Sequence, residues 1–251
     1  MNESEAVTAL RAAGCVFAED EAAMLIRAAP DDHVLAAMVR RRAQGEPLEQ
    51  VVGFADFAGV RVRLRPGVFV PRVRSELLVR EAVRRTADRA VIVDLCCGSG
   101  ALGLAVRRHR PAATLHATDI DPVAVACARD NLGEAGDVFQ GHLFDPLPRG
   151  LEVDVLLANV PYVATGHIPF LPAEARDHEP RTALDGGDDG LEVFRAVVAE
   201  APLWLAPGGV LLSEITEAQA GDAAAALRDT GFKSEVTTDD DLEATVIIGV
   251  R

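Results

Sequence analysis

Hydrophobic residues recur at helical spacing near the amino end of the chain. In the segments EAVTALRAAG and HVLAAMVRRRAQG, Ala, Leu, Val and Met return every three or four positions, which predicts helices over residues 3–43. Gly14 and Gly45 mark helix ends, and Pro30 with the two aspartates after it indicates a break followed by a helix cap. We therefore expect the chain to begin with a small helical region.

The pattern changes after residue 50. In VVGFADFAGVRVRLRPGVFV, residues 51–70, Val and Phe alternate with polar residues, while Gly59 and Pro66-Gly67 supply turns, so a β-hairpin is predicted. A helix from about Ser75 to Arg89 is expected to follow, with Ser75 as its cap.

From residue 91 onward, short apolar runs alternate with helical segments. The runs VIVDL, TLHATD, DVFQGH, VDVLLAN and GGVLLSEI are typical of strands, whereas ALGLAVRRH, PVAVACARDNL, LEVFRAVVAEAPLWL and AGDAAAALRDTG are typical of helices. Such alternation predicts an α/β fold, a mainly parallel sheet covered on both faces. About five residues join the last two strands, FKSEVTT and ATVIIGV, and so short a link requires antiparallel pairing.

Composition narrows the classes of protein. The chain has 251 residues, 49% apolar and 25% charged, which is typical of a folded protein of one large domain or one large and one small domain. A net charge of −14 would repel a phosphate backbone, so we expect no direct nucleic-acid binding. No apolar run could span a bilayer, and the acidic start MNESEAVTAL lacks a secretory signal. Four cysteines, two of them adjacent, do not form a disulfide framework in a chain of this length, so we expect the protein in the reducing cytoplasm.

Arginine is unevenly distributed. Residues 38–89 carry 12 Arg against 6 acidic residues, whereas residues 91–251 carry 11 basic and 26 acidic residues. The Arg-rich segment either faces an acidic partner or forms a solvated surface, and the solvated surface is the simpler interpretation.

A glycine-rich turn follows the first strand of the alternating region. The strand reaches Asp94 and the next helix opens at Ala101, at the kind of strand end where ligands bind in doubly wound sheets. Gly98 and Gly100 permit close backbone approach, and the amides at the helix start favour an anionic group. About 25 residues further on, Asp119 ends the second strand and can accept both hydroxyls of a ribose.

Two cofactors fit this layout. A dinucleotide would prefer GxGxxG, whereas the turn here reads Cys-Cys-Gly-Ser-Gly behind a buried acid, Asp94, which suits a ligand with a cationic amino-acid tail. S-adenosylmethionine has such a tail, and we predict that it is the cofactor. The alternative is a tight turn that binds no ligand. The adjacent Cys96 and Cys97 cannot readily chelate one zinc ion, and the six histidines form no ligand pattern, so no metal is expected.

A second polar loop follows the fourth strand of this region. Asn159 can accept one hydrogen of a planar NH2 group through its side chain, and the carbonyl of Val160 can accept the other. Pro161 stiffens the loop, and Tyr162, the only tyrosine, can lie against the planar group. The alternative interpretation is that these residues form an ordinary turn in which an aromatic residue occurs by chance.

With these segments the chain resembles the HemK-like protein-(glutamine-N(5)) methyltransferases, which modify the GGQ-motif glutamine of peptide-chain release factors. The resemblance extends over nearly the whole chain and includes RRAQGEPLEQVVGFADFAG, VDLCCGSGALGLA, ATDIDPVAVACARDN and LLANVPYV. It implies a helical substrate-recognition domain over residues 1–50, a β-hairpin linker over 51–74 and a seven-stranded, Rossmann-like methyltransferase domain over 75–251. It also implies a cytoplasmic enzyme, expected to be a monomer, that acts on a release factor.

The resemblance assigns roles by position. It implies that four residues hold the methyl acceptor: Asn159, Val160, Pro161 and Tyr162. It implies that the cofactor is bound by residues at or after the ends of four strands, namely Asp94, Cys96, Cys97, Gly98, Ser99, Gly100, Asp119, Ile120, His142, Leu143 and Asn159.

Three positions depart from the family pattern. Val160 replaces the first proline of Asn-Pro-Pro-Tyr, Arg74 stands where Pro-Arg-Pro-Glu-Thr-Glu has an acid, and His142 occupies a position that is commonly Asp. These changes affect the identity of the methyl acceptor more than the type of reaction. The main alternative is therefore a paralogue that methylates a small-molecule amine or amide. A DNA adenine methyltransferase is disfavoured by the net charge of −14. A catalytically silent cofactor-binding protein is disfavoured because Asn159 and Tyr162 are both present.

Overall fold

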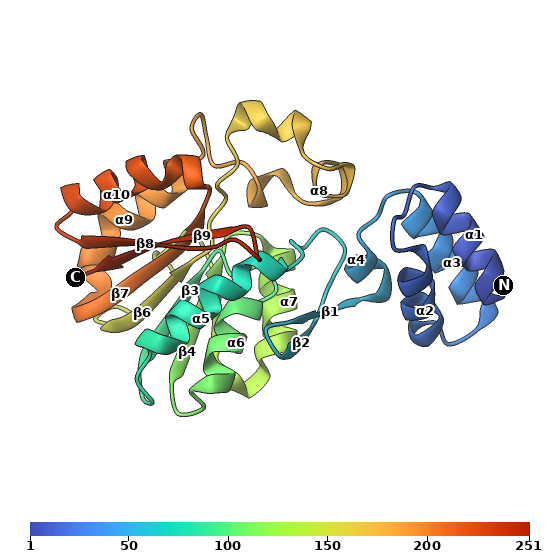
Figure 1. Cartoon of the computed structure of the whole chain (residues 1–251). Coiled ribbons are helices and arrows are strands. Elements are labelled where there is room, and N and C mark those ends of the chain that lie inside the picture. The colour runs from blue at the N-terminus through green and yellow to red at the C-terminus, as the bar shows by residue number, and fades with distance from the viewer.

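Seven strands form one mixed sheet in the later part of the chain, within a computed structural model that describes all of residues 1–251 (Figure 1). Their order across the sheet is β5-β4-β3-β6-β7-β9-β8. The five neighbouring strands β5, β4, β3, β6 and β7 run parallel to one another, and β9 is antiparallel to both its neighbours. This arrangement confirms the α/β fold. The strands are β3 (Val91–Leu95), β4 (Thr114–Asp119), β5 (Asp137–Gln140), β6 (Val153–Ala158), β7 (Leu205–Ile215), β8 (Lys233–Asp239) and β9 (Ala244–Val250).

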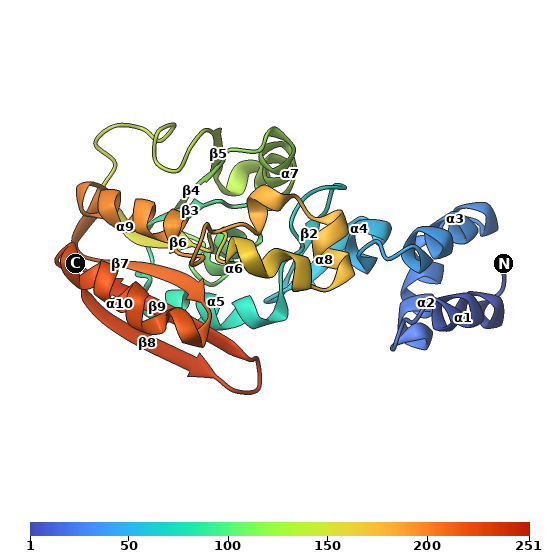
Figure 2. The same cartoon turned by 90° about the horizontal axis from the view of Figure 1, so that it is seen from above.

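Helices cover both faces of this sheet, as Figures 1 and 2 show. Because successive strand residues point to opposite faces, Ile92 of β3 packs into one core cluster and Val93 into another. Burial on both sides explains the continuous apolar run VIVDL. The first cluster includes α5 (Glu76–Arg85), α6 (Ala101–His109) and α7 (Pro122–Leu132), and the second includes α9 (Glu192–Trp204) and α10 (Ala220–Asp229).

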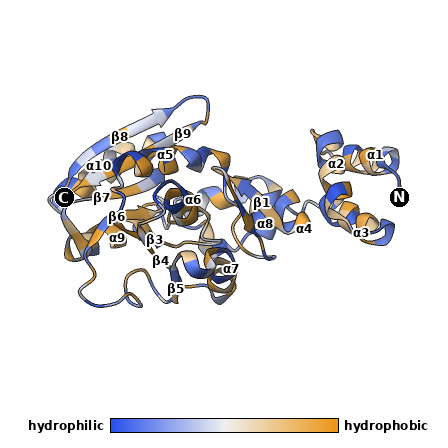
Figure 3. Cartoon of the chain, turned by 90° about the horizontal axis from the view of Figure 1, so that it is seen from below, coloured by the Kyte–Doolittle hydropathy of each residue, from blue (hydrophilic) through white to orange (hydrophobic).

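The expected antiparallel pairing of the last two strands is confirmed. Strand β8 lies at the edge of the sheet, where most of its residues are exposed or half-buried, whereas β9 is almost entirely buried. Figure 3 shows this contrast, with β8 pale to blue and the central strands largely orange. An edge strand with polar, charged positions is also poorly suited to pairing with another chain.

The amino-terminal helices have a core of their own. Nine buried residues, all between Ala6 and Val51, form a cluster separate from the two that flank the sheet. Figure 1 shows these helices beyond the hairpin, away from the sheet. The helices are α1 (Glu3–Ala12), α2 (Ala18–Ala28), α3 (Asp32–Ala43) and α4 (Leu48–Val52), and the hairpin strands are β1 (Phe54–Phe57) and β2 (Val60–Arg63).

The structure corrects the expected start of the hairpin. Val51 and Val52 belong to α4, a single helical turn that ends at Gly53, which has a φ of 82°. Val51 is buried in the amino-terminal core, so tertiary packing rather than alternation determines its conformation. The expected strand DVFQGH is also too long, because β5 ends at Gln140, opposite the last residue of β4.

Ser75 occupies the N-cap position of α5, as expected, but its side chain makes no capping hydrogen bond. Its hydroxyl donates instead to Glu214 on β7. The helix itself ends at Arg85 and not at Arg89.

Most arginines of the Arg-rich segment are paired with acidic residues. Nine of the 12 form ion pairs, which favours internal charge balance over an acidic partner: Arg41, Arg42, Arg61, Arg65, Arg72, Arg74, Arg80, Arg84 and Arg85. One of these pairs, Arg42 with Glu174 on α8 (Ala173–His178), joins the amino-terminal helices to the segment between β6 and α9. No helix has the length and apolar character that crossing a membrane would require.

Candidate functional site

An enclosed cavity lies where the carboxyl ends of β3, β4 and β6 meet. Because these strands are parallel neighbours, their ends share one edge of the sheet. The cavity is lined by the glycine turn after β3 (residues 96–99), by Asp119 and Ile120 after β4, and by residues 159–162 after β6. Two loops predicted separately from the sequence thus face one space.

The glycine turn requires left-handed backbone at several positions. Cys96, Gly98 and Gly100 have φ values of 54°, 56° and 76°. A Cβ at position 98 would meet no other atom within 4 Å, so this position leaves room along the cavity wall. A Cβ at position 100 would lie 2.4 Å from Cδ1 of Leu132 on α7, so that glycine serves helix packing.

Asp119 ties the turn to the end of β4. Its Oδ2 accepts the Gly98 N–H at 2.9 Å, and its Oδ1 accepts the Asp121 N–H at 2.9 Å. Burial raises the pKa of this carboxyl above its ordinary value. Each carboxylate oxygen can accept a further hydrogen bond, so the pair can still receive two ribose hydroxyls from the cavity. Ile120 beside it is 58% exposed and lines the same cavity.

Asp94 is buried one layer behind the turn. Its Oδ2 accepts the Gly103 N–H at 2.9 Å, whereas its buried Oδ1 has no hydrogen-bond donor. Burial raises the pKa of Asp94 to about 7. A buried carboxyl with an unpaired oxygen next to the cavity loop suits a cationic group nearby, which agrees with the chemistry of an amino-acid tail.

Four predicted cofactor residues do not line the cavity. They are Asp94, Gly100 and two residues that follow β5, His142 and Leu143. His142 is exposed, and Leu143 is buried among the core residues that pack under α9, where its carbonyl accepts the Thr118 hydroxyl. The position of Leu143 against an adenine therefore stays a prediction.

The two adjacent cysteines are shielded. Burial raises the pKa of the Cys96 and Cys97 thiols, and the aspartates nearby raise it further, so both stay neutral. Neutral thiols of this kind act as small side chains in the turn.

The loop of residues 159–162, called the acceptor loop from here on, presents an unpaired acceptor. The Oδ1 of Asn159 is buried and has no hydrogen-bond donor, while its Nδ2 donates to the Ser75 hydroxyl oxygen at 3.4 Å. Burying a carbonyl without a partner costs free energy, so this oxygen is suited to an incoming N–H. Val160 is 2% exposed, packs in the core and also lines the cavity.

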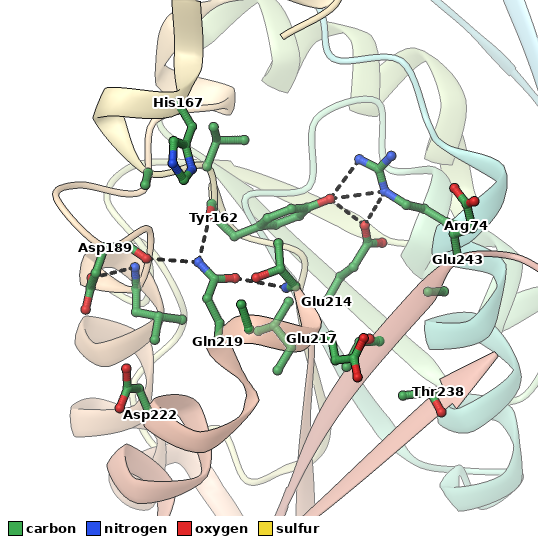
Figure 4. Close-up of a pocket in the computed structure, with 18 of the residues that line it drawn as sticks. Arg74, Tyr162, His167, Asp189, Glu214, Glu217, Gln219, Asp222, Thr238 and Glu243 are labelled. Atoms are coloured by element: carbon green, nitrogen blue, oxygen red, sulfur yellow. Dashed lines mark hydrogen bonds and ion pairs between the residues drawn. The ribbon is translucent and has the colours of Figure 1, made fainter. Parts of the chain in front are cut away.

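A buried carboxylate behind this loop was missed by the sequence analysis. Glu214, near the end of β7, is 2% exposed and accepts three hydrogen bonds. They come from the Tyr162 hydroxyl at 2.6 Å, the Arg74 Nε at 2.8 Å and the Ser75 hydroxyl at 2.5 Å. Figure 4 shows Tyr162 and Arg74 converging on Glu214. Its place at a strand end in GGVLLSEI was the signal that could have found it.

A second, wider cleft lies beside Tyr162 (Figure 4). Its volume is about 1010 Å³, and Arg74 and Tyr162 line both this cleft and the first cavity. Acidic side chains dominate its wall: Asp188, Asp189, Glu214, Glu217, Asp222, Asp239, Asp240 and Glu243. The last residue of the acceptor loop, Tyr162, thus borders both the narrow cavity and the open acidic cleft.

Comparisons with known proteins find methyltransferases. The family model described as "Methyltransferase small domain" matches residues 59–171. A release factor glutamine methyltransferase from Geobacter sulfurreducens is 36% identical over 217 residues, which are 85% of this chain and 76% of that protein. A 4-amino-L-phenylalanine/4-methylamino-L-phenylalanine methyltransferase from Streptomyces pristinaespiralis is 39% identical over 209 residues, 80% of this chain and 71% of that protein.

Solved structures share the fold. A 16S rRNA methyltransferase from T. thermophilus, in complex with AdoMet and guanosine, superposes with a TM-score of 0.55 at 20% identity. The match covers 79% of this chain and 49% of that one.

Proposed function

The chain belongs to the release factor glutamine methyltransferase family, and from this membership we propose that it methylates the side-chain amide of a glutamine in a peptide-chain release factor. The methyl donor is S-adenosylmethionine. One observation supports the acceptor class most directly: the buried, unpaired Oδ1 of Asn159 beside the glycine turn. A primary amide offers two N–H groups, one for this oxygen and one for the Val160 carbonyl.

The residues around the cavity fit the methyl donor. We propose that Asp119 accepts the ribose hydroxyls, that the turn of residues 96–100 follows the methionine part, and that the unpaired Oδ1 of Asp94 attracts its ammonium group. When bound, this donor supplies an electrophilic methyl group on a sulfonium, which needs little activation.

The enzyme's task is then to align the acceptor nitrogen. An amide nitrogen is a poor nucleophile because its lone pair is delocalised into the carbonyl. Positioning of a reacting group can contribute roughly 7–11 kcal/mol in the best cases. Asn159 and the Val160 carbonyl orient the nitrogen and stabilise positive charge that develops on it. The methylated nitrogen is acidic enough to lose its proton to water, so no general base is assigned.

The rest of the chain is suited to a protein substrate. A glutamine side chain in the narrow cavity needs an open path for the polypeptide on either side, and the acidic cleft beyond Tyr162 offers one. We propose that residues 1–50 form a substrate-recognition domain, residues 51–74 a linker and residues 75–251 the catalytic domain. The Arg42–Glu174 pair supports this role, because it couples α3 to the segment that follows the acceptor loop.

A second candidate is methylation of an aromatic amine. It is favoured by the 39% identity to the 4-amino-L-phenylalanine methyltransferase and by the departures at Val160 and Arg74. An arylamine also carries two N–H groups and would fit the same acceptors. The cytoplasmic location, the monomeric state and the lack of nucleic-acid binding stay predictions.

Mass spectrometry distinguishes the two acceptors. The protein is incubated with methyl-labelled S-adenosylmethionine and either a release factor or 4-amino-L-phenylalanine, with a release factor whose GGQ glutamine is replaced by alanine as control. We expect label on the GGQ glutamine and none on the control. Label on the amino acid alone would replace the release-factor assignment with the arylamine one.

A further inference from the structure

The acceptor loop is held from behind by a single carboxylate. Two of the three donors that reach Glu214 connect it to the parts of the loop that would hold the acceptor. Ser75 links Glu214 to the Asn159 side chain, and the Tyr162 hydroxyl links Glu214 to the aromatic ring. Ser75 lies 139 residues from Glu214 in the sequence, so the link exists only in the folded chain.

We propose that Glu214 is a positioning residue for the methyl acceptor, which acts through Ser75 on the amide of Asn159 and through the hydroxyl of Tyr162 on its ring. The proposal rests on the proposed function, in which the acceptor loop binds the group to be methylated. Glu214 itself does not line the narrow cavity, and its side chain is almost fully buried.

The direction of each hydrogen bond determines which end of Asn159 faces the acceptor. A carboxylate only accepts hydrogen bonds, so the Ser75 proton is committed to Glu214. The Ser75 oxygen can then act only as an acceptor toward Asn159, and Asn159 must offer its Nδ2. This leaves Oδ1 free for the incoming N–H. A flipped amide would instead present its own NH2 to the acceptor's NH2.

The ring of Tyr162 is fixed by the same carboxylate. Burial raises the pKa of Tyr162, and the neighbouring Glu214 raises it further, so the hydroxyl keeps its proton and donates it to Glu214. Arg74 supplies the balancing positive charge, donating to Glu214 at 2.8 Å and to the Tyr162 oxygen at 2.8 Å. The base that replaces the family's acid at position 74 is therefore part of this network.

The test begins with the orientation of Asn159, which is independent of any acceptor. In 15N-labelled protein with bound S-adenosylmethionine, the Asn159 side-chain amide is assigned by its absence in Asn159→Ala. We expect one ordered pair of amide signals in the wild type, broadened or doubled signals in Ser75→Ala and in Glu214→Gln, and recovery in Ser75→Thr, which keeps the hydroxyl. Unchanged Asn159 signals in Ser75→Ala would overturn the proposal.

Kinetics with the release factor give the second readout. Ser75→Ala and Glu214→Gln should each lower kcat by roughly 10- to 100-fold, the scale of a misplaced reacting group, while the Kd of S-adenosylmethionine changes less than about twofold. The double variant should lose little beyond Glu214→Gln, because both changes break one relay. Glu152→Gln, an exposed acid that lines neither the narrow cavity nor the acidic cleft, is the matched control. Additive losses, or equal losses in cofactor affinity, would refute the relay.

The two assays separate the proposal from the function it rests on. An ordered Asn159 that depends on Ser75, in a wild type that methylates no release factor, would support the relay and reject the acceptor. A wild type active on the release factor whose Ser75→Ala variant keeps full kcat would reject the relay alone.

Discussion

Replacing Asp119 by alanine tests the cofactor side of the site. The carboxylate stands at the junction of the glycine turn and β4, and in the proposed complex it accepts two ribose hydroxyls. Hydrogen bonds to a charged group contribute about 1.5–3 kcal/mol each. We use the lower value, because both oxygens already accept a backbone N–H. Two lost bonds then amount to about 3 kcal/mol, which raises the Kd of S-adenosylmethionine by more than about 100-fold.

Isothermal titration calorimetry measures this change directly. Asp119→Asn, which keeps the shape and one acceptor oxygen but loses the charge, should bind with intermediate affinity. Asp145→Ala, an exposed acid further along the chain, should bind like the wild type. Because Asp119→Ala also leaves the Gly98 N–H without its acceptor, thermal unfolding must show that the variant is folded at the titration temperature. A folded Asp119→Ala protein within threefold of the wild-type Kd would show that the ribose is bound elsewhere.

Four further predictions concern single positions. Asn159→Ala should reduce methyl transfer to background while keeping the Kd of S-adenosylmethionine within a few fold; normal turnover would place the chemistry in another loop. Val160→Pro keeps the carbonyl and stiffens the loop, so the rate on a release-factor glutamine should hold or rise, whereas a fall would indicate that Val160 shapes the pocket for another acceptor. Gly100→Ala should lower the free energy of unfolding by about 2–4 kcal/mol, because an alanine there is strained in the left-handed region and overpacks against Leu132. Gly98→Ala should lower it by only about 1 kcal/mol but should weaken cofactor binding. Urea titration would have to show the difference in stability, and calorimetry the loss of cofactor affinity in Gly98→Ala. Burial raises the pKa of Asp94 to about 7 in the folded chain, from an ordinary value of 3.8. The protonated carboxyl therefore stabilises the fold fully below a pH of about 4, and this stabilisation is lost as the pH rises through 7. Asp94→Asn should remove this part of the pH dependence of the unfolding free energy in urea, and an unaltered pH profile would refute the raised pKa.

The fold could be predicted largely from the sequence because the central strands are buried on both faces. Runs such as VIVDL are typical of strands in a covered parallel sheet. The start of the hairpin was wrong for a local reason. Val51 and Val52 are β-branched and adjoin the alternating segment, and only the amino-terminal core, in which Val51 is buried, makes them helical.

The site was predictable where its residues follow strand ends in one short stretch. The glycine turn, Asp119 and the acceptor loop each carry their own local signal, and the parallel topology brings them together. Ser75 carries no such signal, and Glu214 has only its place near the end of β7. The local pattern suggested that Ser75 caps a helix, and only the placement of β7 beside β6 gives its hydroxyl a buried carboxylate instead.

The departures at Val160 and Arg74 are linked through the stiffness of the acceptor loop. A valine where the family has proline frees one backbone torsion, although its side chain is buried and packs in the core. Arg74 acts in the opposite sense, because its guanidinium donates both to the Tyr162 hydroxyl and to Glu214 and so restrains the far end of the same loop. One change loosens the loop and the other tightens it. In the proposed complex, the Asn159 oxygen and the Val160 carbonyl would accept a planar NH2 group with or without the two changes. An acceptor other than glutamine would then be selected by the surroundings of this pair, namely the side chain at position 160 and the acidic cleft that Tyr162 also lines.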